Sequence, residues 1–268
     1  MRRLIVACIF ALLMGCPTLG HAENYALDFD GVDDYVSAPD SNSLDLTSGL
    51  TIEAWINPRE YANGANVIAS KWYPSSYIFK LHNDGSGKLR IELSKGGFND
   101  LANLKGNTAV SLDQWTHVAT TFNGAETKLF VNGSFDGSQT QSGSIVPNSK
   151  PFYIGSVDGG EVFHGLIDEV RIWNYARSQQ QLQDYMNGPL TGNEQGLMGY
   201  WNFDEGTGNT LGDLTQFGND GQIYGARWVS SDSPVTTPVP EPTSLMLLSM
   251  GLLGAGVLKA KRRNFKKS

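Results

Sequence analysis

The sequence predicts an all-β domain, an antiparallel two-sheet jelly-roll sandwich, within a chain of 268 residues. Three observations predict it. Apolar and polar residues alternate with a period of two in most segments between positions 25 and 173. Asn-Gly pairs at 123–124 and 132–133 separate such segments, and this pair is the strongest short signal for a hairpin turn. The 31 glycines and an aromatic content of 10% suit many short strands joined by tight turns.

The alternation assigns the strands in chain order. The first strand, Tyr25–Asp30, ends at Gly31, and the strand 50–56 stops before Asn57-Pro58. Further strands are predicted at 67–70, 77–83, 89–94, 115–122, 127–131, 152–155 and 165–173. One short helix is predicted over 179–186, with Ser178 as its N-cap and Gly188 after its end. This spacing is typical of a jelly-roll sandwich.

The N-terminus reads as a secretory signal peptide over residues 1–22. Two arginines precede the apolar run 4–14, and Gly20 and Ala22 occupy the small positions expected before a cleavage site. Residues 13–16, Leu-Met-Gly-Cys, also resemble a lipoprotein box in which Cys16 is acylated, and an uncleaved anchor is a further alternative. Since Cys8 and Cys16 are the only cysteines, the exported body has no disulfide.

The C-terminus has the features of a second targeting signal. Pro240-Glu241-Pro242 precedes the apolar stretch 243–258, and a basic tail follows. Sixteen residues fall short of the ~20 that span a bilayer comfortably, which indicates a transient anchor. The order resembles the PEP-CTERM sorting signal, which spans 239–268 here. The resemblance implies processing near the motif by an exosortase, after transient anchoring in the inner membrane and before a cell-surface, outer-membrane or extracellular-matrix location. The alternative is a plain membrane anchor.

The charge between these two ends is strongly acidic. Of the 20 basic residues, eight lie in 1–22 and 243–268, which contain no acid, so residues 23–242 hold 12 basic against 27 acidic residues, a formal charge of −15. Phosphate backbones repel such a body, which argues against nucleic-acid binding. Hard cations such as Ca²⁺ suit it, because they prefer oxygen ligands.

Four stretches of the body resemble the laminin G-like, concanavalin A-type jelly roll: 26–36, 52–56, 115–133 and 165–174. A fifth stretch, 196–228, opens such domains in many relatives but comes last here, and residues 191–231 are too few for a second core. We therefore expect one domain over 23–231 in which 191–231 completes the sandwich and buries Trp201 or Phe203. Residues 232–238 read as a linker.

Clustered acids suggest a calcium site. Asp28, Asp30, Asp33 and Asp34 surround Gly31, and oxygens at short spacing on a turn can coordinate Ca²⁺. The resemblance implies Asp30, Asp33 and Asp168 as the ligands. The alternative is that these carboxylates only cap turn amides. A weaker second candidate is Asp213 with the stretch 218–221.

Aromatic residues next to Pro74 suggest a ligand surface. Trp72, Tyr73 and Tyr77 cluster in a turn-like stretch, and exposed rings there would form a recognition patch. The alternative is that the rings fold over the edge of the sandwich. The tryptophans at 55, 115, 173 and 201 lie in alternating strands, where we expect core positions.

Catalytic patterns are missing from the sequence. The Glu-x-Asp-x-x-Glu arrangement of related laminarinase-type hydrolases does not occur, and Asp168 and Glu169 are neighbours that a strand directs to opposite faces. His117 sits in an alternating strand as a structural residue. We expect a non-catalytic exported module that binds an extracellular polysaccharide or a surface protein. The rivals are a structural envelope component without a specific ligand and a carbohydrate-active enzyme.

Overall fold

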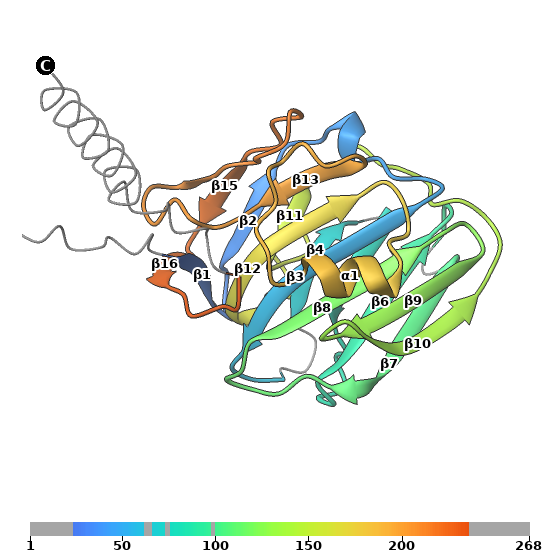
Figure 1. The fold of residues 1–268 in the computed structure, drawn as a ribbon, viewed down its shortest axis with the longest axis horizontal. Coiled ribbons are helices and arrows are strands. Elements are labelled where there is room, and N and C mark those ends of the chain that lie inside the picture. The colour runs from blue at the N-terminus through green and yellow to red at the C-terminus, as the bar shows by residue number, and fades with distance from the viewer. Residues whose placement is uncertain (1–23, 62–65, 73–75, 98–99, 236–268) are drawn as a thin grey trace, which may run out of the picture. The chain divides into compact units, whose positions relative to one another are not determined.

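A computed structural model describes residues 24–61, 66–72, 76–97 and 100–235 (Figure 1). The predicted signal peptide, the Pro240-Glu241-Pro242 motif and the apolar stretch 243–258 lie outside these residues. Within them, no helix has the length and hydrophobicity of a transmembrane span. Residues 23–238 form one compact unit.

Two antiparallel sheets build the domain. The path of sheet A is β10-β9-β8-β3-β12-β1-β16, with β13 also on β12, and the path of sheet B is β14-β15-β2-β11-β4-β5-β6-β7. The strands of sheet A are β1 (Tyr25–Asp30), β3 (Leu50–Pro58), β8 (Thr116–Phe122), β9 (Glu126–Val131), β10 (Ser134–Thr140), β12 (His164–Trp173), β13 (Leu197–Trp201) and β16 (Arg227–Ser230). Those of sheet B are β2 (Tyr35–Ala38), β4 (Val67–Lys71), β5 (Ser76–Leu81), β6 (Lys88–Ser94), β7 (Ala102–Ala109), β11 (Phe152–Ile154), β14 (Thr210–Leu211) and β15 (Gly221–Tyr224).

The core lies between the sheets because the period-two alternation turns every second side chain inward. Leu27 and Phe29 of β1 and Ile52 of β3 meet residues such as Phe152 of β11. The Phe152 ring stacks on Trp201 with a centroid distance of 5.1 Å. The jelly-roll class predicted from the alternation is therefore the observed fold.

The last third of the domain contributes strands to both sheets. β13 pairs with β12 and β16 with β1 in sheet A, while β15 pairs with β2 in sheet B. Trp201 and Phe203 are both fully buried, as the sequence predicts. The C-terminal strands thus pair with the N-terminal strands within the compact unit 23–238, which makes this unit suitable for experiments.

The predicted linker starts too early. Ser233 and Val235 are buried, and the Asn24 amide donates to the Ser233 hydroxyl and to the Val235 carbonyl, both at 3.0 Å. Residues 232–235 therefore pack against the chain at Asn24, just before the first strand, although their Ser- and Pro-rich composition suggested free chain. Residues 236–238 lie outside the described part.

Local signals agree with the structure at the turns and at the helix. Asn132 and Gly133 have φ values of +48° and +68° between β9 and β10, as a type I′ turn requires. The α-helix α1 (Gln179–Tyr185) starts at Ser178 with a capping box completed by Gln181. It lies across the outer face of sheet A (Figure 1), where Leu182 packs on Ala119 and Phe130.

Candidate functional site

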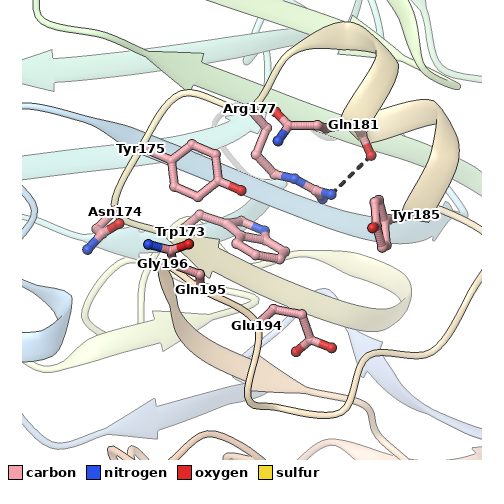
Figure 2. A pocket seen from close by; sticks show the side chains of 9 residues that line it. All are labelled: Trp173, Asn174, Tyr175, Arg177, Gln181, Tyr185, Glu194, Gln195 and Gly196. Atoms are coloured by element: carbon pink, nitrogen blue, oxygen red, sulfur yellow. Dashed lines mark hydrogen bonds between the residues drawn. The ribbon is translucent and has the colours of Figure 1, made fainter.

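A pocket of about 560 Å³ opens beside α1 on the outer face of sheet A. Its walls are the chain after β12, the helix, and the loop that leads into β13 (Figure 2). The lining residues are Trp173, Asn174, Tyr175, Arg177, Gln181, Tyr185, Glu194, Gln195 and Gly196. We call this cavity the helix pocket. Its volume suits a small ligand or a few units of a polymer.

Aromatic rings form the apolar part of the helix pocket. Trp173 is almost completely covered, whereas Tyr175 is half-buried and Tyr185 is 48% exposed. The Arg177 guanidinium lies 4.2 Å from the ring centre of Trp173 and 5.2 Å from that of Tyr185. It also donates to the Gln181 carbonyl at 3.0 Å (Figure 2). Arg177 therefore ties the helix to the sheet, and Tyr175 and Tyr185 are the rings that a ligand can reach.

A buried ionic layer beneath the helix fixes this arrangement. Glu53 of β3 is fully buried and accepts hydrogen bonds from Trp173 Nε1 at 2.7 Å and from Arg177 at 2.5 Å. His117 Nε2 lies 3.2 Å from its second oxygen. Burial by itself raises the pKa of Glu53, but the His117 hydrogen bond and the charges of Arg171 and Arg177 outweigh it and lower the pKa to about 2. The Glu53 carboxylate is thus ionised and fully engaged.

The rim of the helix pocket is polar. The side-chain amides of Asn174 and Gln195 are exposed and make no hydrogen bond to another described residue. Glu194 Oε1 accepts from the amide and the hydroxyl of Thr191 at 2.7 and 2.9 Å. Burial raises the pKa of Glu194, but these Thr191 hydrogen bonds prevail and lower it. Flat rings flanked by amides and one carboxylate can bind a ligand that has both an apolar face and hydroxyl groups.

The acidic turn between β1 and β2 forms a second candidate site. Ligand atoms of Asp30, Asp33 and Asp34 lie within 4.8 Å of one another. Asp30 Oδ1 accepts from the Val32 amide and Asp34 Oδ2 from the Asp30 amide, both at 2.8 Å, so the turn-capping interpretation is confirmed for these two residues. Burial raises the pKa of Asp34. The remaining carboxylate oxygens are of the type that Ca²⁺ prefers, so the donor set fits a hard cation.

Asp168 does not join the acidic turn, which corrects the set implied by the family resemblance. Asp30 pairs with His164, and Asp168 lies four residues further along β12, roughly 13 Å away at strand spacing. Asp168 is fully buried and accepts from the hydroxyls of Ser233 at 2.6 Å and Ser231 at 3.3 Å. Asp34 takes its place beside Asp30 and Asp33, because it directly follows them in the turn.

The weaker cation candidate at Asp213 does not suit a metal. Its two oxygens accept five hydrogen bonds, from the amides of Tyr200, Thr215 and Asn219, from the Thr215 hydroxyl and from the Asn219 side chain. All these distances lie between 2.8 and 3.1 Å. The Asp213 carboxylate therefore organises its loop and has no free oxygen lone pairs for an ion.

The predicted aromatic patch is wrong for Trp72 and Tyr77. Tyr77 is fully buried in the core and its hydroxyl donates to the Leu44 carbonyl at 3.3 Å. Trp72 is buried against Val67 and Ile78. Tyr77 occupies a core-facing position of β5, whereas Trp72 follows the end of β4 and packs on Ile78, the next residue of β5, which faces the other side of the sheet. Tyr73 lies outside the described residues.

Sequence reasoning missed the residues of the helix pocket. Trp173 was expected in a core position, and it is buried, yet it also forms the base of a cavity. Tyr175 and Tyr185 lie ten residues apart, and the turn of chain before α1 brings them to opposite walls (Figure 2). The only feature of the local sequence that could have indicated this pocket was the predicted helix, because a helix next to a sheet has to cover one of its faces.

Comparisons with known proteins agree with the fold. Residues 30–183 match the family model of the concanavalin A-like lectin/glucanases superfamily, and residues 238–263 match the PEP-CTERM protein-sorting motif. That motif indicates an exported protein. The chain is also similar to the adhesion G-protein coupled receptor V1 of Danio rerio, with 24% identity over 213 residues. The match covers 75% of this chain and only 3% of the receptor.

Two solved structures are similar to this chain. A Bacteroides ovatus protein proposed to bind carbohydrate superposes with a TM-score of 0.65 at 26% identity. The match covers 80% of this chain and 62% of that one, so this chain spans less than two thirds of its neighbour. Domain 4 of an extracellular arabinanase from Geobacillus stearothermophilus, solved with arabinotriose, has a TM-score of 0.48 at 22% identity. It covers 59% of this chain and 75% of that one.

Proposed function

The chain belongs to the concanavalin A-like lectin/glucanases superfamily, and on that premise we propose that it is an exported, non-catalytic module that binds extracellular polysaccharide in the helix pocket. The observation that carries the proposal is the pairing of reachable tyrosine rings with free amides around one cavity. Tyr175 and Tyr185 offer flat apolar surfaces, and Asn174 and Gln195 offer hydrogen bonds beside them. A sugar ring presents the complementary apolar C–H face and hydroxyl edge.

Charge narrows the class of glycan. The body carries a formal charge of −15, and one of its carboxylates, Glu194, lies at the pocket itself. Anionic polysaccharides would be repelled, so the proposal specifies a neutral glycan. Glu194 is also the single carboxylate among the lining residues, whereas glycosidases generally use two. This favours binding over hydrolysis.

A glycan array on residues 23–238 tests the proposal, followed by affinity electrophoresis on the polysaccharides that respond. We expect Tyr185→Ala to weaken binding about tenfold or more, which corresponds to ~1.4 kcal/mol. Phe217→Ala is the matched control, since this ring is 40% exposed and lies outside the helix pocket. Equal binding by the Tyr185→Ala variant and the unaltered domain would exclude the helix pocket as the binding site.

We also propose that the acidic turn binds calcium. One ion bound to the folded state stabilises it by ~2.7 kcal/mol at a hundredfold excess over Kd. Excess calcium should therefore raise the melting temperature, and Asp30→Asn should remove that rise. Equal melts in EDTA and calcium would leave Asp30, Asp33 and Asp34 as turn caps. A rise that survives Asp30→Asn but disappears in Asp168→Asn would place the ion at Asp168 instead.

Export is proposed to end with exosortase processing near Pro240-Glu241-Pro242. The match to the sorting motif at 238–263 supports this, as does the basic tail that follows the apolar stretch. Mass spectrometry of the protein recovered from the cell surface or medium should detect neither residues 1–22 nor the segment beyond about 243. Recovery of the intact tail would instead indicate a permanent membrane anchor.

A further inference from the structure

Three tyrosines gather on the outer face of sheet B. Tyr35 of β2 and Tyr224 of β15 are cross-strand partners whose rings stack at 4.7 Å with an interplanar angle of 21°. Tyr153 of β11 meets Tyr35 edge-on at 6.0 Å. Their neighbours Val36 and Ile223 point into the core, so the three rings point away from it. We call Tyr35, Tyr153 and Tyr224 the tyrosine face.

The tyrosine face is ordered by contacts among its own side chains, and Tyr224 is its exposed member, since Tyr153 is buried and Tyr35 is half-buried. Tyr153 is held by its hydroxyl, which donates to Asp158 at 2.8 Å, and Tyr35 lies between the other two rings. Tyr224 remains 46% exposed. Because Tyr35 covers one face of the Tyr224 ring, a ligand can use the opposite face and the ring edge. The order that stacking imposes in advance lowers the entropy lost on binding.

Polar groups border these rings. Gln222 and Ser37 are register partners two residues along the strands from Tyr224 and Tyr35, so they point outward on the same face. Gln222 is exposed, and its side-chain nitrogen donates to the Asn209 carbonyl at 2.8 Å, which fixes the amide and leaves its oxygen toward other donors. Rings with adjacent amide and hydroxyl groups suit a sugar better than an apolar protein surface. The charge of −15 again favours an uncharged ligand.

The tyrosine face and the helix pocket lie on opposite sides of the sandwich. Trp173 and α1 belong to the outer side of sheet A, and Tyr224 belongs to the outer side of sheet B. Two packed sheets are ~10 Å apart before their outer side chains are counted. We propose that the tyrosine face is a second binding surface for neutral glycan, so that a single domain cross-links two polysaccharide chains. This inference rests on the function proposed for the helix pocket.

The test separates binding from cross-linking in residues 23–238. Barley β-glucan, arabinan, galactomannan and dextran serve as neutral probes in affinity electrophoresis. The polysaccharide that slows the migration of the protein most is then mixed with protein in a turbidity assay. Light scattering checks that the protein is monomeric, because a dimer would cross-link through one site per subunit. We expect turbidity that rises and then falls as protein is added in excess.

Single variants test the contribution of each binding surface, the helix pocket and the tyrosine face. Tyr224→Ala and Tyr185→Ala should each still be retarded, with about tenfold weaker apparent binding as avidity is lost, yet neither should produce turbidity. The double variant should not bind. Tyr224→Phe keeps the stacked ring and should cross-link, as should the Phe217→Ala control, and thermal melts identify any variant that fails to fold.

Each failure has a distinct meaning. Turbidity from Tyr224→Ala equal to that of the unaltered domain overturns the second surface and leaves the helix pocket intact. Complete loss of binding in Tyr185→Ala, with Tyr224→Ala unaffected, has the same consequence. If Tyr224→Ala alone loses binding, the helix pocket is excluded as a binding site, and the proposal of cross-linking is overturned with it. No retardation by any of the four polysaccharides overturns both proposals.

Discussion

Two carboxylates on neighbouring strands of sheet A are equally buried, but their pKa values are shifted in opposite directions. Glu53 of β3 and Asp168 of β12 both point to the outer side of the sheet, and neither has measurable exposure. The pKa of Glu53 is lowered to about 2. Burial raises the pKa of Asp168 well above its ordinary value, and Glu169 and Asp204 add to the rise.

The partners explain the difference. Glu53 is surrounded by donors and cations, including Arg177, His117 and the Trp173 indole. Asp168 has only the hydroxyls of Ser231 and Ser233, and its Oδ1 has no partner among the described residues. Burial by itself therefore does not determine the direction in which the pKa of a carboxyl group shifts, because neighbouring charges and hydrogen bonds can outweigh desolvation.

The largest effect is expected for Glu53→Ala. This change leaves the Arg177 guanidinium buried without its counter-charge and should lower the free energy of unfolding by about 3–5 kcal/mol at pH 7. It should also loosen α1, so the circular dichroism of the helix and the urea midpoint are the measurements. Lys128→Ala, which removes an exposed ion pair to Glu126 on the same sheet, is the control and should change little. A small effect of Glu53→Ala would mean that solvent replaces the network.

The acid limb of the stability curve provides an independent measure of Glu53. Its folded pKa is below its unfolded value of 4.5, so its contribution is present above pH 4.5 and is lost as pH falls toward 2. The loss should be on the order of 3 kcal/mol over that window. Urea denaturation at stepped pH should show it in the unaltered domain, and the limb should flatten in Glu53→Ala.

Asp168→Asn should act in the opposite direction. Since the folded pKa of Asp168 is raised above 3.8, the unfolded state loses its proton first, and stability falls as pH rises from 3.8 through the folded pKa. Asparagine cannot ionise and so removes this decline. The free energy of unfolding of the variant, relative to that of the unaltered domain, should therefore increase by ~1.4 kcal/mol for each pH unit in that window. A variant that becomes relatively less stable as pH rises would show that Asp168 is ionised in the native state.

The smallest effect is expected for Ser233→Ala. The lost hydrogen bond to Asp168 should reduce the free energy of unfolding by ~1 kcal/mol. That hydrogen bond lowers the pKa of Asp168, so its removal should also move the end of the pH-dependent decline to higher pH. Ser231→Ala, with its longer contact of 3.3 Å, is the matched comparison and should do less. Equal effects would mean that both serines act by packing.

The sequence by itself determined the parts of this protein that depend on local order. Alternation along each strand, the Asn-Gly turn at 132–133 and the Ser178 cap fix the conformation within a few residues, so their chemistry can be recognised in the chain. The jelly-roll class and the burial of Trp201 followed from the same patterns. The acidic turn was equally visible, because Asp30, Asp33 and Asp34 are close in sequence.

Only the tertiary structure decided which distant residues meet. The antiparallel register of β1 and β12 places His164 opposite Asp30 and moves Asp168 to Ser233, 65 positions away in the chain. Packing of α1 on sheet A gathers the walls of the helix pocket, and the pairing of β15 with β2 stacks Tyr224 on Tyr35. Alternation predicts which face a side chain takes, but strand order and register decide its neighbours.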